Sequence, residues 1–349
     1  MPYRIIQTGL GDFGRRWLDV VSRHESWTVA AIATRNSRTR QECGDQAGVP
    51  DSHRFATLSD ALDSGVHADG LLVTTPHFRH AEDVVSGLDH GLHVLVEKPL
   101  AGSWDECLRI RSAAQASDRI VMVAENYRFG EGAQLARRIV ASGEIGIPEF
   151  LCVEYFVGHS FPDGDWRNEY TYPLLIENAT HQFDLVRFIT GTDAERVYCS
   201  VCGSRRTPHW TAPSVSASFE MSEGLHFQFA GSWAYTEFAT PWEGTWRLHG
   251  SEGSLAWTSD EIEIRNSRNA RTVRVPSRPS DATLSATFEE FTAALDEHRS
   301  PGTAVEDNLR TVAMVYGAIR SAEQGAPVSV SEMIREDARR PPSVSQTGL

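Results

Sequence analysis

Lysine is almost missing from this chain of 349 residues: of its 33 lysine and arginine residues, all but Lys98 are arginine. Cysteine is scarce as well, with five scattered residues, which excludes a disulfide-rich scaffold. No run of about 20 apolar residues occurs, so the sequence predicts no membrane span. A basic excess is also missing, because 47 acidic residues give a formal net charge of −14. That charge disfavours nucleic acids and anionic membranes as partners and leaves small molecules.

The amino terminus has no signal-peptide pattern, since residues 3–6 already read as a strand. Cys199 and Cys202 form a C-x-x-C, but they fall in a β-rich run, where residues three apart point to opposite faces. We therefore interpret them as free thiols and predict no metal site. A reducing, cytoplasmic location is expected.

Residues 3–14 read YRIIQTGLGDFG, a short apolar strand that runs into a G-x-G-x-x-G motif. Helical spacing of apolar residues follows, and then a second buried strand at 27–33. In such a βαβ unit Gly9 allows the tight turn, Gly11 admits a pyrophosphate, and Gly14 lets helix and strand pack closely. The context predicts dinucleotide binding at the helix amino terminus.

The second strand ends in Thr34, Arg35, Asn36, Ser37 and Arg38, without the acid that would bind the ribose hydroxyl of NAD. Hydroxyl and guanidinium groups suit a 2′-phosphate instead. The alternative is a solvated loop that happens to be basic. We favour NADP over NAD.

Strands and helices alternate up to a last strand at 119–124, which predicts a doubly wound parallel sheet of the Rossmann type over residues 1–126. Ligands of such sheets bind at the carboxyl ends of the strands. Residues 127–335 are predicted to form an α/β domain. Many short alternating stretches between 196 and 275 indicate strands, and two helices are expected at about 285–297 and 305–324. Residues 336–349 read as a loose tail.

Several motifs follow one another in a specific order: GLGDFG at 9–14, TPHFRH at 75–80, EKP at 97–99, ENYRF at 125–129, SGEIG at 142–146, ENATHQFDL at 177–185 and GSEGSL at 250–255. Together they resemble the Gfo/Idh/MocA family of NAD(P)-dependent oxidoreductases over roughly residues 3–330. The resemblance implies a Rossmann domain followed by an α/β domain with a large open, mostly antiparallel sheet. It also implies a homodimer or homotetramer formed through that sheet.

The family's catalytic site implies roles for three residues of this chain. His181 is the expected general base, Lys98 would bind the reacting oxygen, and Glu177 would orient substrate or tune Lys98. Asp184 would orient His181 or cap the helix. Most relatives have Asp at the position of Glu177, and many have a Gly-rich run where residues 172–175 read YPLL, so the substrate is left open.

Motifs and resemblance together predict two sets of residues. The cofactor-binding set is Gly9, Gly11, Asp12, Phe13, Gly14, Thr34, Arg35, Arg38, Thr75, Pro76, His80, Glu97, Lys98, Asn126, Trp166 and Arg167. The substrate-binding set is Lys98, Arg128, Tyr155, Glu177 and His181. Arg128 could instead form an interdomain ion pair, and Trp166 could be a hydrophobic plug.

The expected function is hydride transfer between NADP or NAD and a secondary alcohol or ketone of a sugar, inositol or polyol. Alternatives are a non-catalytic dinucleotide sensor, redox-assisted glycoside cleavage, and imine or enone reduction. Lys98 argues for catalysis. Arginine serves equally well at a solvated surface, whereas a compact donor to a single oxygen cannot be replaced by a planar guanidinium.

Overall fold

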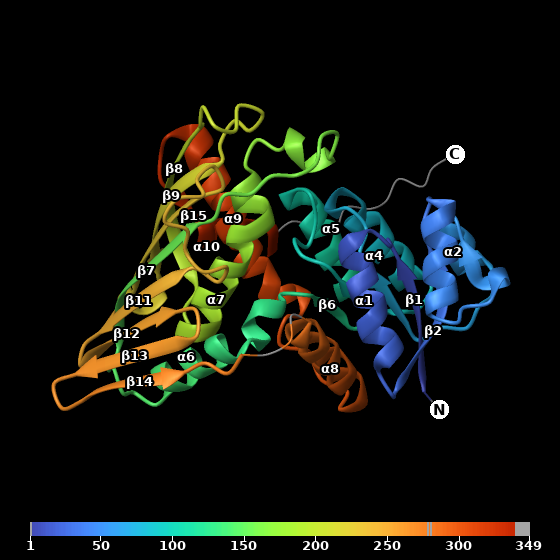
Figure 1. The fold of residues 1–349 in the computed structure, drawn as a ribbon, viewed down its shortest axis with the longest axis horizontal. Coiled ribbons are helices and arrows are strands. Elements are labelled where there is room, and N and C mark those ends of the chain that lie inside the picture. Colours follow the sequence, from blue (N-terminus) through green and yellow to red (C-terminus); the bar gives the residue numbers. More distant parts are fainter. Residues whose placement is uncertain (1, 278, 280, 339–349) are drawn as a thin grey trace. The chain divides into compact units, whose positions relative to one another are not determined.

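The protein divides into two compact units in the computed structural model, which describes residues 2–277, 279 and 281–338 (Figure 1). The first unit contains the chain through Asn126 together with Pro279–Leu309, and the second contains Tyr127–Arg278 and the chain from Arg310 onward. The sequence predicted one uninterrupted second domain over 127–335, whereas the structure returns Pro279–Leu309 to the first unit.

The first unit is built on a six-stranded, fully parallel sheet in the order β3-β2-β1-β4-β5-β6. Its strands are nearly all buried, as expected when helices cover both faces of a sheet. The strands are β1 (Tyr3–Thr8), β2 (Trp27–Ala33), β3 (Arg54–Phe55), β4 (Gly70–Val73), β5 (His93–Val96) and β6 (Val121–Val123). The strand order reverses between β1 and β4, which is where ligands bind in sheets of this type.

Three of the connecting helices begin after a residue whose side chain caps them. The hydroxyl of Ser103 accepts a hydrogen bond from the backbone amide of Glu106 and donates to the Glu106 carboxylate. Thr57 caps the helix Leu58–Asp63, because its hydroxyl accepts a hydrogen bond from the backbone amide of Asp60. The helices are α1 (Asp12–Arg23), α2 (Ser37–Gln46), α3 (Leu58–Asp63), α4 (His80–Asp89) and α5 (Trp104–Gln115).

Aromatic packing explains why α8 (Ala282–Asp296) joins the first unit. The ring of Trp27 stacks on Phe291 with centroids 5.9 Å apart and lies 5.4 Å from Phe288. Its indole N–H donates to the hydroxyl of Thr292 at 2.9 Å. Beyond α8, Thr303 exchanges hydrogen bonds with Val123 and so covers the edge strand β6.

The second unit contains a nine-stranded sheet in the order β14-β13-β12-β11-β7-β10-β9-β8-β15, antiparallel except for the β7–β10 pair. Burial alternates along β7, with Leu151, Val153 and Tyr155 on the covered face. The strands are β7 (Pro148–Phe156), β8 (Ala194–Cys202), β9 (Ser214–Met221), β10 (His226–Ser232), β11 (Thr245–Gly250), β12 (Gly253–Thr258), β13 (Glu261–Asn266), β14 (Ala270–Arg274) and β15 (Val328–Ser329).

Helices α6 (Glu131–Ala141) and α7 (Thr180–Thr190) lie along one face of this sheet (Figure 1). Helix α9 (Val305–Gln324) begins in the first unit and continues in the second, and Gly325, at φ +63°, ends it as the sequence predicts. A further helix, α10 (Val330–Ala338), extends into the first three residues of the predicted tail, whose residues 339–349 lie outside the described part. Within the described residues, no helix is both long and apolar enough to cross a bilayer.

Candidate active site

The glycine turn between β1 and α1 leaves no room for side chains at two of its three glycines. Gly9 adopts φ +83°, and a Cβ there would lie 2.5 Å from the carbonyl carbon of Thr74. A Cβ on Gly14 would overlap the carbonyl oxygen of Gly9. These two glycines therefore pack the turn against the end of β4, as the motif predicts.

Gly11 is different, because no described atom lies within 4 Å of the position that its Cβ would take. It is the N-cap of α1, where the first-turn amides of a helix point outward and attract anions. A cradle of main chain with open space at one glycine fits the pyrophosphate of a dinucleotide. Asp12 and Phe13 follow in the first turn, with the Phe13 ring exposed beneath the guanidinium of Arg16.

Two polar residues that the sequence analysis did not name, the buried Gln7 and the half-buried Thr74, hold this turn. Gln7, at the end of β1, donates from its side-chain amide to the carbonyl oxygen of Gly14 at 2.7 Å. The hydroxyl of Thr74 donates to the carbonyl oxygens of Thr8 and Gly9. Both could have been found in the sequence, because each is a polar residue within an apolar strand or directly after one.

The turn after β2 carries the predicted 2′-phosphate residues. Arg35 is exposed, and Asn36 caps α2 through the amide of Thr39 at 2.9 Å. Arg38 instead donates to Glu42 at 2.7 Å, and Arg15 shares the same carboxylate. The side chain of Arg40, which the sequence reading did not consider, donates to the carbonyl oxygen of Thr34. Arg35 is thus the more available of the two predicted guanidinium groups.

His80 joins the turns that follow β4 and β5. Its Nε2 lies 2.8 Å from the carbonyl oxygen of Thr75, and its Nδ1 lies 3.0 Å from that of Pro99. Burial lowers the pKa of His80 to about 4, and a neutral imidazole can donate to only one of the two carbonyls. The hydroxyl of Thr75 donates to Asp83 at 2.7 Å, while Pro76 starts the short helix η2 (His77–Arg79). His80 therefore braces the two turns.

Glu97 holds the turn that presents Lys98. The indole of Trp17 donates to one carboxylate oxygen of Glu97 at 2.6 Å, and the backbone amide of Lys98 donates to the other at 3.0 Å. Burial raises the pKa of Glu97 to about 7. The Lys98–Pro99 peptide bond is cis. Lys98 thus follows β5 at the same edge of the sheet as the glycine turn.

Asn126 is the last residue of the first unit before the chain crosses to the second. Its side-chain amide donates to the hydroxyl of Thr283, near the start of α8, at 2.8 Å. This predicted cofactor-binding residue therefore also links the end of β6 to the returning segment.

In the second unit, Glu177 lies in a π-helical turn, η5 (Leu175–Ala179), that leads directly into α7. The helix is therefore wider at Glu177 than a regular α-helix. Such turns are frequent at functional sites.

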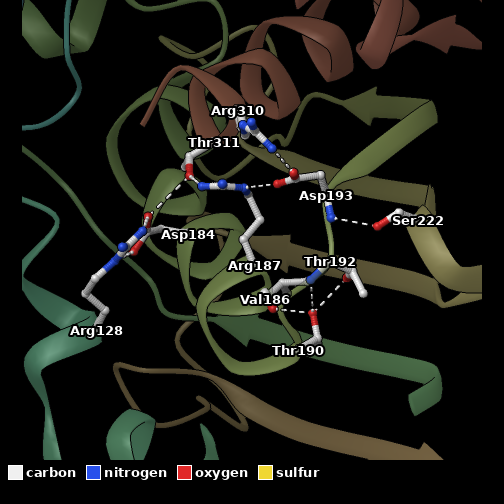
Figure 2. Close-up of polar contacts among 10 residues, drawn as sticks. All are labelled: Arg128, Asp184, Val186, Arg187, Thr190, Thr192, Asp193, Ser222, Arg310 and Thr311. Carbon is white, nitrogen blue, oxygen red and sulfur yellow. Dashed lines mark hydrogen bonds and ion pairs between the residues drawn. The ribbon is translucent and has the colours of Figure 1, made fainter. Parts of the chain in front are cut away.

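The ring of His181 is 3% exposed and stacks on the ring of Tyr127, with centroids 3.9 Å apart and planes at 3°. One turn along α7, the carboxylate of Asp184 accepts two hydrogen bonds from Arg128, one of them at 2.8 Å (Figure 2). This ion pair forms inside the second unit. Asp184 is bound to Arg128 and Thr311, a pairing that the sequence reading did not foresee.

Aromatic side chains surround the remaining predicted residues. Trp166 and Arg167 open the short helix η4 (Trp166–Glu169), and Arg167 pairs with Asp165 at 2.7 Å while lying 4.0 Å over the ring of Phe161. Tyr155 is fully buried, with its ring centroid 6.1 Å from that of Trp242.

The sequence reading missed His159, whose ring lies 4.7 Å from Phe161 and 5.0 Å from Trp233. Burial lowers the pKa of His159, Arg167 lowers it further, and Glu177 opposes the shift. Glu177 therefore shares one electrostatic neighbourhood with His159 and Arg167. In the sequence, the only sign of this role for His159 is the number of aromatic residues in the segment that follows β7.

Comparison with known proteins decides the family. The profile described as "Oxidoreductase family, NAD-binding Rossmann fold" matches residues 3–125, and that of the "GFO/IDH/MocA C-terminal domain" matches residues 133–256. The chain belongs to the Gfo/Idh/MocA family. It is accordingly an NAD(P)-dependent oxidoreductase, with the Rossmann unit and the large second sheet that the motifs predicted.

Relatives within the family are distant. The chain is 24% identical to the uncharacterized protein y4oX of Sinorhizobium fredii, covering 96% of this chain and 98% of that one. It is 27% identical to D-xylose 1-dehydrogenase (NADP(+)) 2 of Haloferax volcanii, covering 88% and 93%. Among solved structures, an oxidoreductase from Agrobacterium radiobacter in complex with NAD+, L-tartaric acid and magnesium superposes with a TM-score of 0.89 at 20% identity, covering 95% and 100%. At that identity the likeness shows the fold alone.

Proposed function

We propose that the protein oxidises a secondary alcohol, or reduces the corresponding ketone, of a sugar, inositol or polyol-like substrate. The observation that carries this proposal is the shared sheet edge in the first unit. The open turn at Gly11 and the chain's one lysine, Lys98, follow parallel strands whose carboxyl ends meet there. A relative that acts on D-xylose supports the same substrate class.

Each proposed residue has a defined task. A dinucleotide held at the glycine turn would supply the hydride chemistry. Lys98 donates a hydrogen bond to the substrate oxygen and stabilises its negative charge as the C–O bond order changes. His181 takes the hydroxyl proton during oxidation and returns it during reduction. Glu177, close to His159 and Arg167, orients the substrate hydroxyl groups.

A panel of sugars, cyclitols and sugar acids, each assayed with NAD and NADP, tests this proposal through the nicotinamide absorbance. Substrate-dependent reduction of the cofactor is the expected result, and His181→Ala should lower turnover strongly while cofactor binding is unchanged. Tight dinucleotide binding without turnover on any member would favour the non-catalytic sensor instead.

We infer a preference for NADP from the turn after β2. Arg35 is exposed there and no acid follows the strand, so a 2′-phosphate would find a guanidinium and the hydroxyl of Thr34. Arg35→Ala should lower kcat/KM for NADP about 10-fold or more and leave that for NAD nearly unchanged. Arg38→Ala is the matched control, because its guanidinium already pairs with Glu42 and a smaller change is expected. Equal use of NAD and NADP by the unmodified protein would contradict the preference.

A homodimer or homotetramer built through the second sheet, and a cytoplasmic location, stay predictions. Phe150, on the uncovered face of β7, and Ile147, just before that strand, are exposed apolar side chains that support the first. Light scattering of the purified protein would give the oligomeric mass, and a monomer at micromolar concentration would contradict this prediction.

A further inference from the structure

Two adjacent residues at the start of the second unit each contact α7. Tyr127 and Arg128 lie in the short helix η3 (Asn126–Phe129), directly after the chain leaves the first unit. Tyr127 stacks on His181, and Arg128 pairs with Asp184. His181 and Asp184 are three residues apart and therefore share a helix face. A single turn of chain thus holds that face at two points.

The Arg128–Asp184 pair fixes the distance and direction of this attachment. Both side chains are buried, and a guanidinium fork that meets a carboxylate with two hydrogen bonds has little rotational freedom. The hydroxyl of Thr311 on α9 donates to Asp184 at 3.2 Å and accepts from Arg187 at 2.9 Å, and Arg187 continues to Asp193 (Figure 2). The chain of contacts therefore ties η3, α7 and α9 together around the attachment point.

The stack itself has an unusual geometry. Aromatic rings usually prefer offset or edge-to-face contacts, with centroids 4.5–7 Å apart. The rings of Tyr127 and His181 are closer, at 3.9 Å, and almost parallel, at 3°. With one face covered, the imidazole can meet other groups only through its edge, where both nitrogens lie, or through its opposite face.

The far end of Tyr127 is held as well. The indole N–H of Trp242 donates to the hydroxyl of Tyr127. Trp242 lies between β10 and β11 and is 43% exposed, and its ring centroid is 6.1 Å from those of Tyr155 and His159. Tyr127 is therefore held by its backbone neighbour Arg128 at one end and by Trp242 at the other.

We propose that Tyr127 is a positioning residue that fixes the plane of the His181 imidazole, and that Trp242 keeps Tyr127 in place. The inference rests on the proposed function, in which His181 moves the substrate proton. A ring that swings out of plane would present its nitrogen at the wrong angle to the substrate hydroxyl. Misplacement by about 1 Å can reduce turnover by about 100-fold.

The test compares Tyr127→Phe with Tyr127→Leu in the full-length protein loaded with NADP. Phenylalanine keeps the stacking face and loses only the hydroxyl, so we expect kcat within about 5-fold of the unmodified protein. Leucine removes the aromatic plane, and we expect kcat to fall about 10- to 100-fold with KM changed less than about 3-fold. Tyr198→Leu, an exposed tyrosine on β8, is the matched control and should retain full activity.

A second measurement reports the stack without any turnover. The ring current of Tyr127 should shield the ring protons of His181, whose NMR signals are assigned by their loss in His181→Asn. These signals should move downfield in Tyr127→Leu and shift only partly in Tyr127→Phe, which keeps the stacking ring and loses the hydrogen bond from Trp242. Signals that do not move in the leucine variant would overturn the stack, and signals that move while kcat is unchanged would overturn the positioning role.

Trp242→Phe provides a variant that leaves both stacked rings intact, in case Tyr127→Leu does not fold. Loss of its N–H should lower kcat about 2- to 5-fold, with a partial shift of the His181 signals. No change in either quantity would remove Trp242 from the proposal. If His181→Ala retains turnover, the base assignment fails and the positioning role with it, whereas the NMR signals still report whether the rings stack.

Discussion

The glycine turn of the first unit and the histidine of the second are held in position by different means. Gly9 and Gly14 pack directly against main-chain atoms, and the whole turn lies within a dozen consecutive residues. The ring of His181 stacks on Tyr127 of η3, whose hydroxyl accepts a hydrogen bond from Trp242 of the β10–β11 connection. On the same helix, Asp184 is bound by Arg128 of η3 and Thr311 of α9. The first arrangement is sensitive to an atom added at Gly9 or Gly14, whereas the second depends on pairs of partners and is sensitive to the loss of either one.

The largest effect is expected at the glycine turn. Gly9→Ala requires a Cβ 2.5 Å from main chain at φ +83°, so the turn must shift, and dinucleotide binding should weaken at least about 100-fold with a clear loss of stability. Gly11→Ala is the matched control, because its Cβ enters open space. It should keep the melting temperature and still weaken cofactor binding. Calorimetric titration with NADP and thermal unfolding distinguish the two, and equal unfolding behaviour would contradict the contrast.

Lys98→Arg tests whether the one lysine needs its compact ammonium group. We expect kcat to fall about 100-fold or more, because a planar guanidinium cannot occupy the same point beside the substrate oxygen. The melting temperature should hardly change, since the turn is held by Glu97 through the backbone amide of Lys98. A fully active arginine variant would reduce the EKP motif to a structural turn.

Breaking the buried Arg128–Asp184 pair should lower the stability of the protein more than its turnover. Asp184→Asn leaves the Arg128 guanidinium buried without its counter-charge, and we expect the free energy of unfolding to drop by about 3–5 kcal/mol. Glu220→Gln breaks an exposed pair with Arg196 on the nine-stranded sheet and should leave the free energy of unfolding nearly unchanged. Urea unfolding measures both, and similar values would show that burial does not distinguish these pairs.

The smallest effect concerns the pH dependence produced by Glu97. Its carboxyl group has a pKa of about 7 in the folded protein and an ordinary value of 4.5 when unfolded. The unfolded chain therefore loses this proton first, and folding stability should fall as pH rises from 4.5 to 7, by at most about 3 kcal/mol. Glu97→Gln should flatten that part of the curve. Thermal unfolding at pH 5 and pH 7.5 compares the two proteins, and parallel curves would contradict the prediction.

What could be predicted from the sequence follows the same division. Strands β1, β2, β4, β5 and β6 were readable because burial on both faces produces continuous apolar runs, whereas β3, with two half-buried residues, has no such run. The glycine turn was readable because its geometry demands particular residues within a few positions. Strands of the second sheet were readable from their alternation. The π-helical turn at Glu177 was not, since nothing in LIENA distinguishes it from a regular helix.

Contacts between distant residues left no trace in the sequence. The Tyr127–His181 stack joins residues far apart in the chain, and either residue alone is unremarkable in composition or spacing. The return of α8 to the first unit depends on the packing of Phe288 and Phe291 against Trp27, which helical spacing shows as an apolar face without naming its partner. His159 was likewise not predicted, because an aromatic-rich loop indicates that its rings pack together but not which residues contact one another.

The return of Pro279–Leu309 has a consequence for exchange of modules between relatives. The chain changes units after Asn126, again before Pro279 and a third time within α9. A single crossover at residue 126 between two family genes would combine strands β1–β6 of one parent with α8 of the other. Trp27 would then pack against α8 residues that come from a different protein. A chimaera that takes each whole unit from a single parent therefore requires two further junctions, one before Pro279 and one within α9.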